Sequence, residues 1–121
     1  AHNGTVFSLA INPRSKSLFS GGKDACIKMF ENGGEVQSVP AHLLHVHRLC
    51  INYEREWMLS SSMDKTVKVW EIKGLRLIKV IDFERNGGHT SSVNKILWID
   101  KNTIISCSDD RTLKCFEIKE T

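Results

Sequence analysis

The chain has 121 residues, of which 40% are hydrophobic and 26% charged, and its formal net charge is +3 without a concentrated basic block. These values are typical of one soluble globular domain. No apolar run approaches the roughly 20 residues that span a bilayer, and the N-terminal AHNGTVF lacks the basic start and apolar core of a signal peptide. The composition therefore predicts a domain with no membrane association.

The four cysteines predict a reducing environment. Cys26, Cys50, Cys107 and Cys115 form no Cys-x-x-Cys pair, and each lies in an apolar, strand-like run. Small buried thiols are expected at such positions, and a disulfide framework is not expected in a chain with enough apolar residues for a core. We therefore expect a cytoplasmic location.

In chain order, short runs of β-branched and apolar residues alternate with turns. The turns include Asn-Pro-Arg-Ser at 12–15, Gly-Gly-Lys-Asp at 21–24 and Asn-Gly-Gly at 32–34, and Pro40 is expected to stop the fourth run. Eleven strands are expected: Thr5–Ile11, Ser17–Ser20, Cys26–Phe30, Glu35–Val39, His45–Ile51, Trp57–Ser61, Thr66–Glu71, Leu75–Ile81, Ser92–Trp98, Thr103–Ser106 and Thr112–Ile118. Evenly spaced strands without a convincing helix predict an all-β repeat architecture.

One layout of four residue types occurs three times, and the copy at 42–70 is the most complete. A histidine is followed by an aspartate after 22, 22 and 21 residues, a serine precedes that aspartate by four, and an aromatic residue follows it by six. The three sets are His2, Ser20, Asp24 and Phe30; His42, Ser60, Asp64 and Trp70; and His89, Ser106, Asp110 and Phe116. A period near 40 residues predicts an array of one repeated unit, with repeats at 1–40, 41–87 and 88–121.

The second set has the chemistry of a closed hydrogen-bond network. His42 can donate to Asp64 from one ring nitrogen and accept from Ser60 with the other, while the indole of Trp70 can donate to Ser60. A catalytic triad is the rival interpretation, but it needs an exposed nucleophile, and three copies in one chain favour a structural role. The sequence therefore predicts no catalytic residue and no cofactor.

These residues carry a resemblance to a known family. The Ala-His, Ala-His and Gly-His dipeptides, the Ser-x3-Asp turns and the closing aromatic residues resemble the WD-repeat (WD40) β-propeller family over essentially the whole chain. The resemblance implies three four-stranded antiparallel blades, the last of which lacks its fourth strand. The sequence departs from the family pattern at the closing dipeptide, which reads Phe-Glu, Trp-Glu and Phe-Glu. Because phenylalanine cannot donate a hydrogen bond, the first and third blades are expected to be less tightly held.

Propellers of this family are closed rings of about four to eight blades. Three blades therefore resemble the C-terminal part of a larger propeller, or a partial ring that other copies complete, for instance two chains that give six blades. The separation between the turn aspartate and the next repeat histidine is 25 residues after Asp64 but 18 residues after Asp24. Seven additional residues are therefore inserted around 82–88.

The resemblance also implies where a partner protein or peptide binds. The narrower top face of these propellers is lined by the third and fifth residues after each histidine and by the residue before each turn aspartate. Those positions here are Thr5, Phe7 and Lys23, then His45, His47 and Met63, then Ser92, Asn94 and Asp109, and the insertion adds Phe83 and Arg85. Phe7 and Met63 are either interface anchors or residues that pack against a neighbouring loop. The chain is accordingly interpreted as a non-enzymatic protein-interaction scaffold.

Three other functions would each need a different set of residues. The pattern H-x2-H-x-H-x2-C from His42 to Cys50 has zinc-ligand residue types, but His42 is assigned to Asp64 and Cys50 to the apolar side of its strand; His45 and His47 are expected to give the top face a pH-sensitive charge instead. A nucleic-acid or phosphate-binding surface could use an outward row of lysines, Lys28, Lys68 and Lys114, with Lys73, Arg76, Lys79 and Arg85, but no aromatic stacking platform accompanies them. A propeller enzyme would need a cofactor motif or paired acidic cleft that the sequence lacks.

Overall fold

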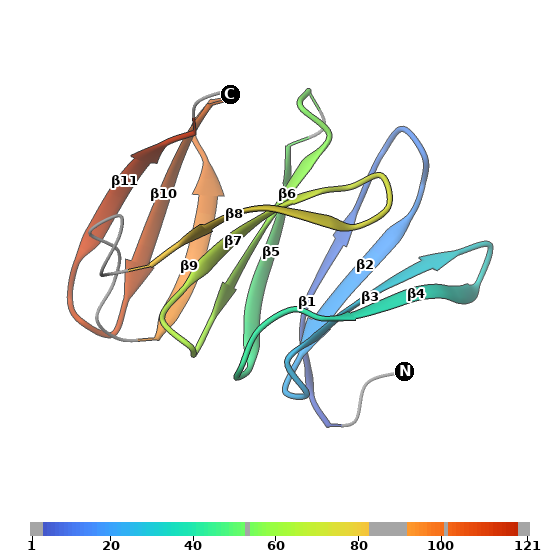
Figure 1. Ribbon diagram of the computed structural model, residues 1–121, viewed down its shortest axis with the longest axis horizontal. Coiled ribbons are helices and arrows are strands. Elements are labelled where there is room, and N and C mark those ends of the chain that lie inside the picture. The colour runs from blue at the N-terminus through green and yellow to red at the C-terminus, as the bar shows by residue number, and fades with distance from the viewer. Residues whose placement is uncertain (1–3, 53, 83–91, 101, 119–121) are drawn as a thin grey trace.

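The computed structural model describes residues 4–52, 54–82, 92–100 and 102–118. It contains three antiparallel sheets that stand side by side (Figure 1), and sequential strands are neighbours in each of them. Blade 1 comprises β1 Val6–Ile11, β2 Leu18–Gly22, β3 Cys26–Glu31 and β4 Gly34–Pro40; blade 2 comprises β5 Val46–Asn52, β6 Trp57–Ser62, β7 Val67–Glu71 and β8 Arg76–Ile81; blade 3 comprises β9 Val93–Trp98, β10 Thr103–Ser108 and β11 Leu113–Glu117. The predicted all-β fold of 4, 4 and 3 strands is confirmed.

Some strand ends differ from the prediction. Pro40 does not stop β4 but is its last residue, opposite Cys26. Proline is tolerated there because β4 lies at the edge of the sheet and its missing N–H removes no bond to a further strand. β2 and β10 also continue two residues beyond the predicted serines, to Gly22 and Ser108.

Alternating side chains on each strand pack against different neighbours, which follows from the two-residue period of a strand. In β6, Met58 belongs to a core between blades 1 and 2, whereas Leu59 belongs to a core between blades 2 and 3. The first core comprises Phe19, Ile27, Ala41, Val46, Leu49, Met58, Trp70, Ile72 and Leu75. The second comprises Leu59, Val67, Val69, Ile81, Val93, Ile96, Ile104 and Ile118. Blade 2 is therefore buried on both faces.

Polar contacts add to this packing between blades. The hydroxyl of Ser8 on β1 accepts a hydrogen bond from the backbone N–H of Leu49 on β5 at 3.1 Å. The indole of Trp98 on β9 donates to the carbonyl of Cys50 on β5 at 3.2 Å. The first strands of successive blades are thus joined to one another. Within the described ranges, no helix is long and apolar enough to cross a membrane.

Candidate protein-interaction site

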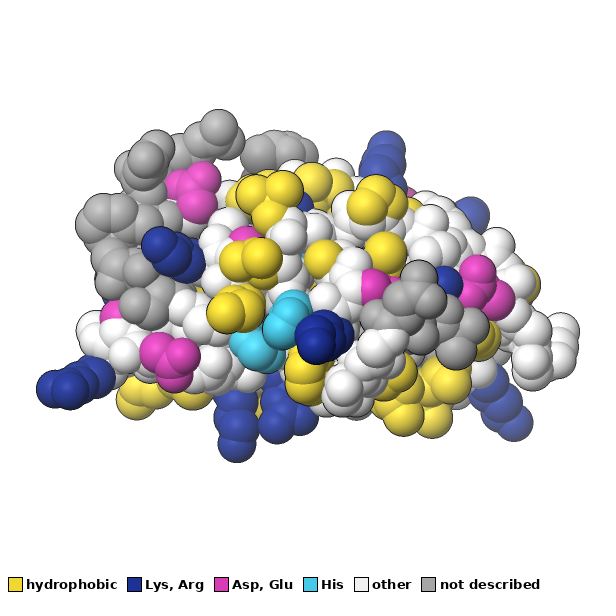
Figure 2. All heavy atoms as spheres, turned by 90° about the horizontal axis from the view of Figure 1, so that it is seen from below, with side chains coloured by type: hydrophobic (Ala, Val, Ile, Leu, Met, Phe, Trp, Pro, Cys, Tyr) yellow, Lys and Arg dark blue, Asp and Glu magenta, His cyan; other side chains and the backbone are white. Residues whose placement is uncertain are grey.

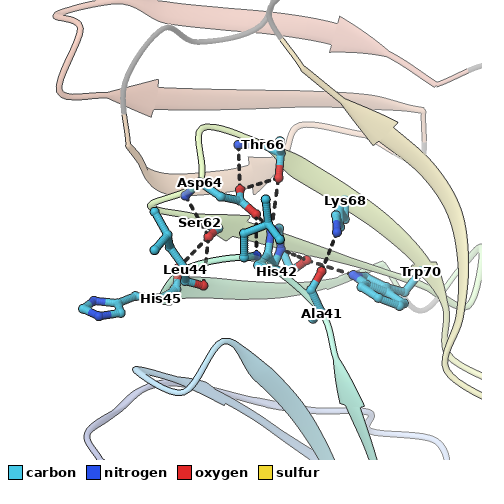
Figure 3. Close-up of polar contacts among 11 residues, drawn as sticks. Ala41, His42, Leu44, His45, Ser62, Asp64, Thr66, Lys68 and Trp70 are labelled. Carbon is cyan, nitrogen blue, oxygen red and sulfur yellow. Dashed lines mark hydrogen bonds and ion pairs between the residues drawn. The ribbon is translucent and has the colours of Figure 1, made fainter.

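The predicted network in blade 2 is present and closed (Figure 3). His42 Nδ1 lies 2.8 Å from Asp64 Oδ2 and donates to it, because a carboxylate can only accept. His42 Nε2 then accepts from the Ser60 hydroxyl at 2.7 Å, and that hydroxyl accepts from Trp70 Nε1 at 2.8 Å. His42, Ser60 and Trp70 are buried. Their network joins the connection between blades 1 and 2, which carries His42, to β6 and β7.

Burial and hydrogen bonding set the charge states of this network. Burial lowers the pKa of His42 below its ordinary 6.5, more than the neighbouring Asp64 raises it. Burial alone raises the pKa of Asp64, but the hydrogen bond and charge of His42, with bonds from Thr66 and from the Leu43 N–H, lower it well below its ordinary value. The pair is therefore a neutral imidazole beside a carboxylate at neutral pH, which suits a structural network.

The turn aspartates have the same role in all three blades. Asp24, Asp64 and Asp110 each accept a hydrogen bond from the backbone N–H two residues later, at 3.2, 3.0 and 3.0 Å. The residue after each aspartate adopts a positive φ, between 67° and 75°. An aspartate side chain that bonds its own turn in this way is a common turn device. The partners predicted for Asp24 and Asp110, His2 and His89, lie outside the described residues.

The predicted interface positions meet at one end of the sheets, which we call the top face: the end that carries the β2–β3, β6–β7 and β10–β11 turns. In each blade, the same backbone hydrogen bond joins the third residue after the repeat histidine to the residue before the turn aspartate. The N–H of Lys23, Met63 or Asp109 donates to the carbonyl of Thr5, His45 or Ser92, at 2.8, 3.0 and 3.2 Å respectively. The repeat register inferred from the sequence is therefore retained in space. Phe83 and Arg85 fall outside the described part of the chain.

In each blade, the top-face residue five positions after the repeat histidine lies in a β-bulge. Strand pairing skips Phe7 in β1, His47 in β5 and Asn94 in β9, which are equivalent residues of the three repeats. A bulged residue leaves the ladder, and its side chain is re-aimed relative to its neighbours. The same irregularity thus presents one side chain per blade.

These side chains form a continuous row across the three blades. The ring of Phe7 lies 5.7 Å from that of His45 and 5.8 Å from that of His47, between centroids. His47 Nε2 lies 2.9 Å from the Ser92 hydroxyl, and Asn94 Nδ2 donates to Asp109 at 2.7 Å. Figure 2 looks onto this face and shows the histidines beside hydrophobic side chains, with basic side chains along the lower edge.

The surroundings of His47 favour its neutral form. Burial lowers its pKa, and the neighbouring His45 and Arg48 lower it further, whereas Asp109 opposes them. His47 is therefore neutral at neutral pH, and the expected pH-sensitive charge of this face stays a prediction for more acidic conditions.

Comparison with known proteins decides the family. The family model "WD domain, G-beta repeat" matches residues 1–31, 33–71 and 78–117. The chain belongs to the WD-repeat family. In three solved structures of this fold class the similarity covers 98% of the chain: U3-55K, with a TM-score of 0.87 at 20% identity, the RRP9 WD40 repeats, with 0.87 at 21%, and the WD40 β-propeller domain of Doa1, with 0.80 at 27%. These matches cover 37–38% of the solved chains.

Relatives of WD-repeat type match at the sequence level too. The small ribosomal subunit protein RACK1 of Glycine max is 24% identical over 106 residues, covering 80% of this chain and 32% of that protein. WD repeat-containing protein 37 of Mus musculus is 24% identical over 121 residues, covering 98% and 24%. Nuclear distribution protein PAC1 of Ajellomyces capsulatus is 36% identical over 66 residues, covering 54% and 13%. The chain therefore spans a third or less of these relatives' length. WD-repeat propellers are generally protein-interaction scaffolds without enzymatic activity.

The sequence did not predict two exposed residues of this WD-repeat top face. Leu43 and Leu44 follow the buried His42 and are both exposed, beside the exposed Met63. The signal was present in the sequence, because two leucines occupy a connection between strands where polar residues are more usual. The backbone of Leu43 is fixed by its bond to Asp64 Oδ2 at 3.1 Å, so its side chain is held at the surface.

The structure changes the interpretation of the lysine row. Lys28 and Lys68 are half-buried, not on an outward, solvated face. Lys28 Nζ pairs with Glu35 at 3.0 Å, and Lys68 Nζ donates to the Ala41 carbonyl at 2.6 Å. Arg76 pairs with Glu71 at 2.8 Å. Lys68 lies on the sheet face directed toward blade 1, because it shares the face of Trp70 on β7. Each of these three cations therefore has a partner within the protein.

The zinc-like pattern and the cysteines have structural explanations as well. Both ring nitrogens of His42 are occupied by Asp64 and Ser60, and among the described residues no group of three His, Cys, Asp or Glu side chains is arranged to hold a metal. The four cysteines are free thiols. None of them is fully buried, and Cys115 is exposed, contrary to the prediction, because it lies on the open outer face of blade 3.

Proposed function

We propose that this chain is part of a non-enzymatic interaction scaffold that binds a partner protein or peptide on its top face. One observation carries the proposal: bulged Phe7 and the exposed Leu43, Leu44 and Met63 place large apolar side chains at one end of the sheets. Single exposed apolar residues are ordinary, but several together with aromatic rings are typical of an interface core. Hot-spot residues of interfaces have this character.

Alanine substitutions test the proposal. Phe7→Ala, His47→Ala and Met63→Ala should abolish retention of the partner in a quantitative crosslinking and pull-down comparison, while the melting temperature stays nearly unchanged. Leu77→Ala is the matched control, because Leu77 on β8 is 42% exposed, close to the 43% of Met63, but lies away from the top face. A sharp fall in melting temperature for the top-face variants would show that these residues serve packing, and the proposal would fail.

We also propose that the chain works in a reducing, cytoplasmic compartment. Four free thiols, one of them exposed, support this, because an exposed thiol in an oxidising compartment is prone to pairing. Fluorescence microscopy of a tagged chain tests it, and a secreted or luminal signal would contradict it.

A further inference from the structure

A groove of about 310 Å³ opens at the end of the sheets opposite the top face, which we call the bottom face. It lies between blades 1 and 2, where the β1–β2, β3–β4, β5–β6 and β7–β8 turns meet. The residues that define its chemistry are Ser17, Met29, Glu31, Glu56, Ile72 and Lys73. Its volume is at the lower end of the roughly 300–1,000 Å³ range of small ligand pockets.

The groove is preformed by contacts between the two blades. Gln37 on β4 donates from Nε2 to the carbonyl of Gly74 in the β7–β8 turn at 3.0 Å. Figure 1 shows this yellow turn extending toward blade 1. Gly74 has φ +77°, a conformation that glycine adopts without strain, so the turn can reach across. Buried Ile72 anchors the same turn in the core between the blades.

The walls of the groove carry two carboxylates above an apolar floor. Met29 is half-buried against the blade 1–blade 2 core, and together with Ile72 it supplies the floor. The Glu31 carboxylate on one wall accepts a hydrogen bond from the buried Ser17 hydroxyl at 3.1 Å, so its direction is fixed. Glu56 stands on the other wall. Within the ranges that the structure describes, neither Glu31 nor Glu56 has an ion-pair partner, although Lys73 also lines the groove.

We propose that this groove binds an arginine side chain presented by a segment of a partner protein. An arginine has an apolar stem and a charged end, so the stem can cover Met29 and Ile72 while the guanidinium lies between the two carboxylates. Its five N–H donors suit two acceptors on different walls, and charge-assisted hydrogen bonds of this kind are stronger than neutral ones. This site does not depend on the top face, since the two lie at opposite ends of the sheets.

The charge of Lys73 predicts the sign of a change in affinity for a cationic side chain. It is the one cation among the groove-lining residues, and it weakens the field of the two carboxylates there. Its removal should therefore tighten the binding of a cationic side chain. Loss of the carboxylates should do the reverse.

The experiment uses a fluorescein-labelled pentapeptide with one central arginine in a Gly-Ser background, and an otherwise identical peptide with citrulline, which is neutral and nearly isosteric. Fluorescence anisotropy at low salt should show the arginine peptide binding about ten-fold more tightly than the citrulline peptide. The double variant Glu31→Gln with Glu56→Gln should remove that preference, and Lys73→Ala should increase it. Glu54→Gln is the matched control, because Glu54 is an exposed acid of the same β5–β6 turn that does not line the groove.

Each result of this experiment either supports or overturns the proposal. Equal affinity for the two peptides, no binding of the arginine peptide, or an equal loss of preference in Glu54→Gln would overturn the proposal. A preference that disappears only in the Glu31 and Glu56 variants supports it. Each variant is accompanied by a melting curve, and since top-face binding is measured with different substitutions, failure here leaves the proposed interaction at the top face unaffected.

Discussion

At the scale of single residues, the difference between tryptophan and phenylalanine separates the three blades. Trp70 donates to Ser60 at 2.8 Å and completes the four-member network of blade 2. Phe30 and Phe116 stand at the equivalent positions in blades 1 and 3 and have no group that can donate. Blade 2 therefore has a hydrogen bond that the chemistry of the other two blades cannot supply.

Replacement of the turn aspartates should reveal this difference. Asp64→Ala is expected to lower the free energy of unfolding by about 1–3 kcal/mol, and by more than Asp24→Ala or Asp110→Ala, because it removes a partner from a complete, buried network. Trp70→Phe gives blade 2 the pattern of its neighbours, so Asp64→Ala made in that background should cost less than in the wild type. Urea denaturation of the three aspartate variants, of Trp70→Phe and of the double variant measures the ranking, and equal losses for the three aspartates would contradict it.

The same network predicts a pH dependence of stability. The pKa of His42 is lower in the folded chain than its ordinary 6.5, so the unfolded chain binds the proton more readily. Stability from this group is complete above about pH 6.5 and is lost as the pH falls below that value toward the folded pKa. Asp64, whose folded pKa is also lowered, acts in the same direction but only below about pH 4.

A variant without the titrating ring isolates this contribution. Between pH 6.5 and 5, wild-type stability should fall with a slope of up to about 1.4 kcal/mol per pH unit from this one proton, and His42→Gln should have a smaller slope. His47, whose pKa is lowered too, is present in both proteins and cancels in the comparison. Identical slopes in urea unfolding at several pH values would show that His42 does not titrate in this window.

Contacts between side chains at constant spacing could be predicted from the sequence, whereas contacts with the backbone and exposure to solvent could not. The His42 network could be predicted because its members are fixed by residue chemistry and by constant spacing along the chain. The half-buried position of Lys68 could not, since its Nζ partner is a backbone carbonyl, that of Ala41, which leaves no mark in sequence. The role of Leu43 also depends on which face of the connection is open to solvent.

At the scale of the strands, the alternation of apolar residues predicted all eleven elements, but not how they are deformed. The bulges at Phe7, His47 and Asn94 recur at one repeat position and re-aim the top-face side chains. A bulge needs no special residue type, so three dissimilar side chains occupy it without a common signal. Strand pairing could therefore be read from the sequence, whereas the direction of these three side chains required the structure.

The packing of β2 against β5 yields a further prediction. A Cβ placed on Gly21 would lie 2.6 Å from Val46 Cγ1 on β5, closer than real Cβ contacts. Because Val46 is fully buried in the core between blades 1 and 2, it has little room to move. Gly21→Ala should therefore cost about 1–3 kcal/mol by overpacking. Gly34→Ala is the control, since the nearest atom to its Cβ is 3.9 Å away; a Gly21→Ala variant as stable as Gly34→Ala would contradict close packing of these blades.

At the scale of the whole molecule, equivalent residues differ most in exposure where a neighbouring blade is absent. Leu9, Leu49 and Ile96 hold the same repeat position, but Leu9 on blade 1 is 63% exposed and the other two are 8% and 9% exposed. On the opposite side Leu113 of blade 3 is 72% exposed, whereas its equivalents Ile27 and Val67 are 0% and 1% exposed. Both outer sheet faces thus carry apolar residues whose equivalents are buried wherever two blades adjoin.

These two outer faces predict that the isolated chain associates. Several hundred Å² of apolar surface, at about 25 cal/mol per Å², offers several kcal/mol on burial, and monomers seldom leave such a patch in water. The outer edge of β11 is not paired with another described strand and adds backbone groups to the same site. We expect the faces around Leu9 and Leu113 to join head to tail, with other copies or with further blades, and closure of two chains into six blades is the preferred form.

Light scattering coupled to size-exclusion chromatography measures this directly. The wild-type chain should give a mass above the 13.7 kDa of one copy, rising with concentration until the ring closes. Leu113→Glu places a charge on one outer face and should shift the population toward the monomer, because burial of an unpaired carboxylate is costly. Glu117→Asp, an exposed change on the same strand that keeps the existing charge, should leave the mass unchanged. A wild-type monomer with cooperative unfolding independent of concentration would show that these apolar faces do not drive association.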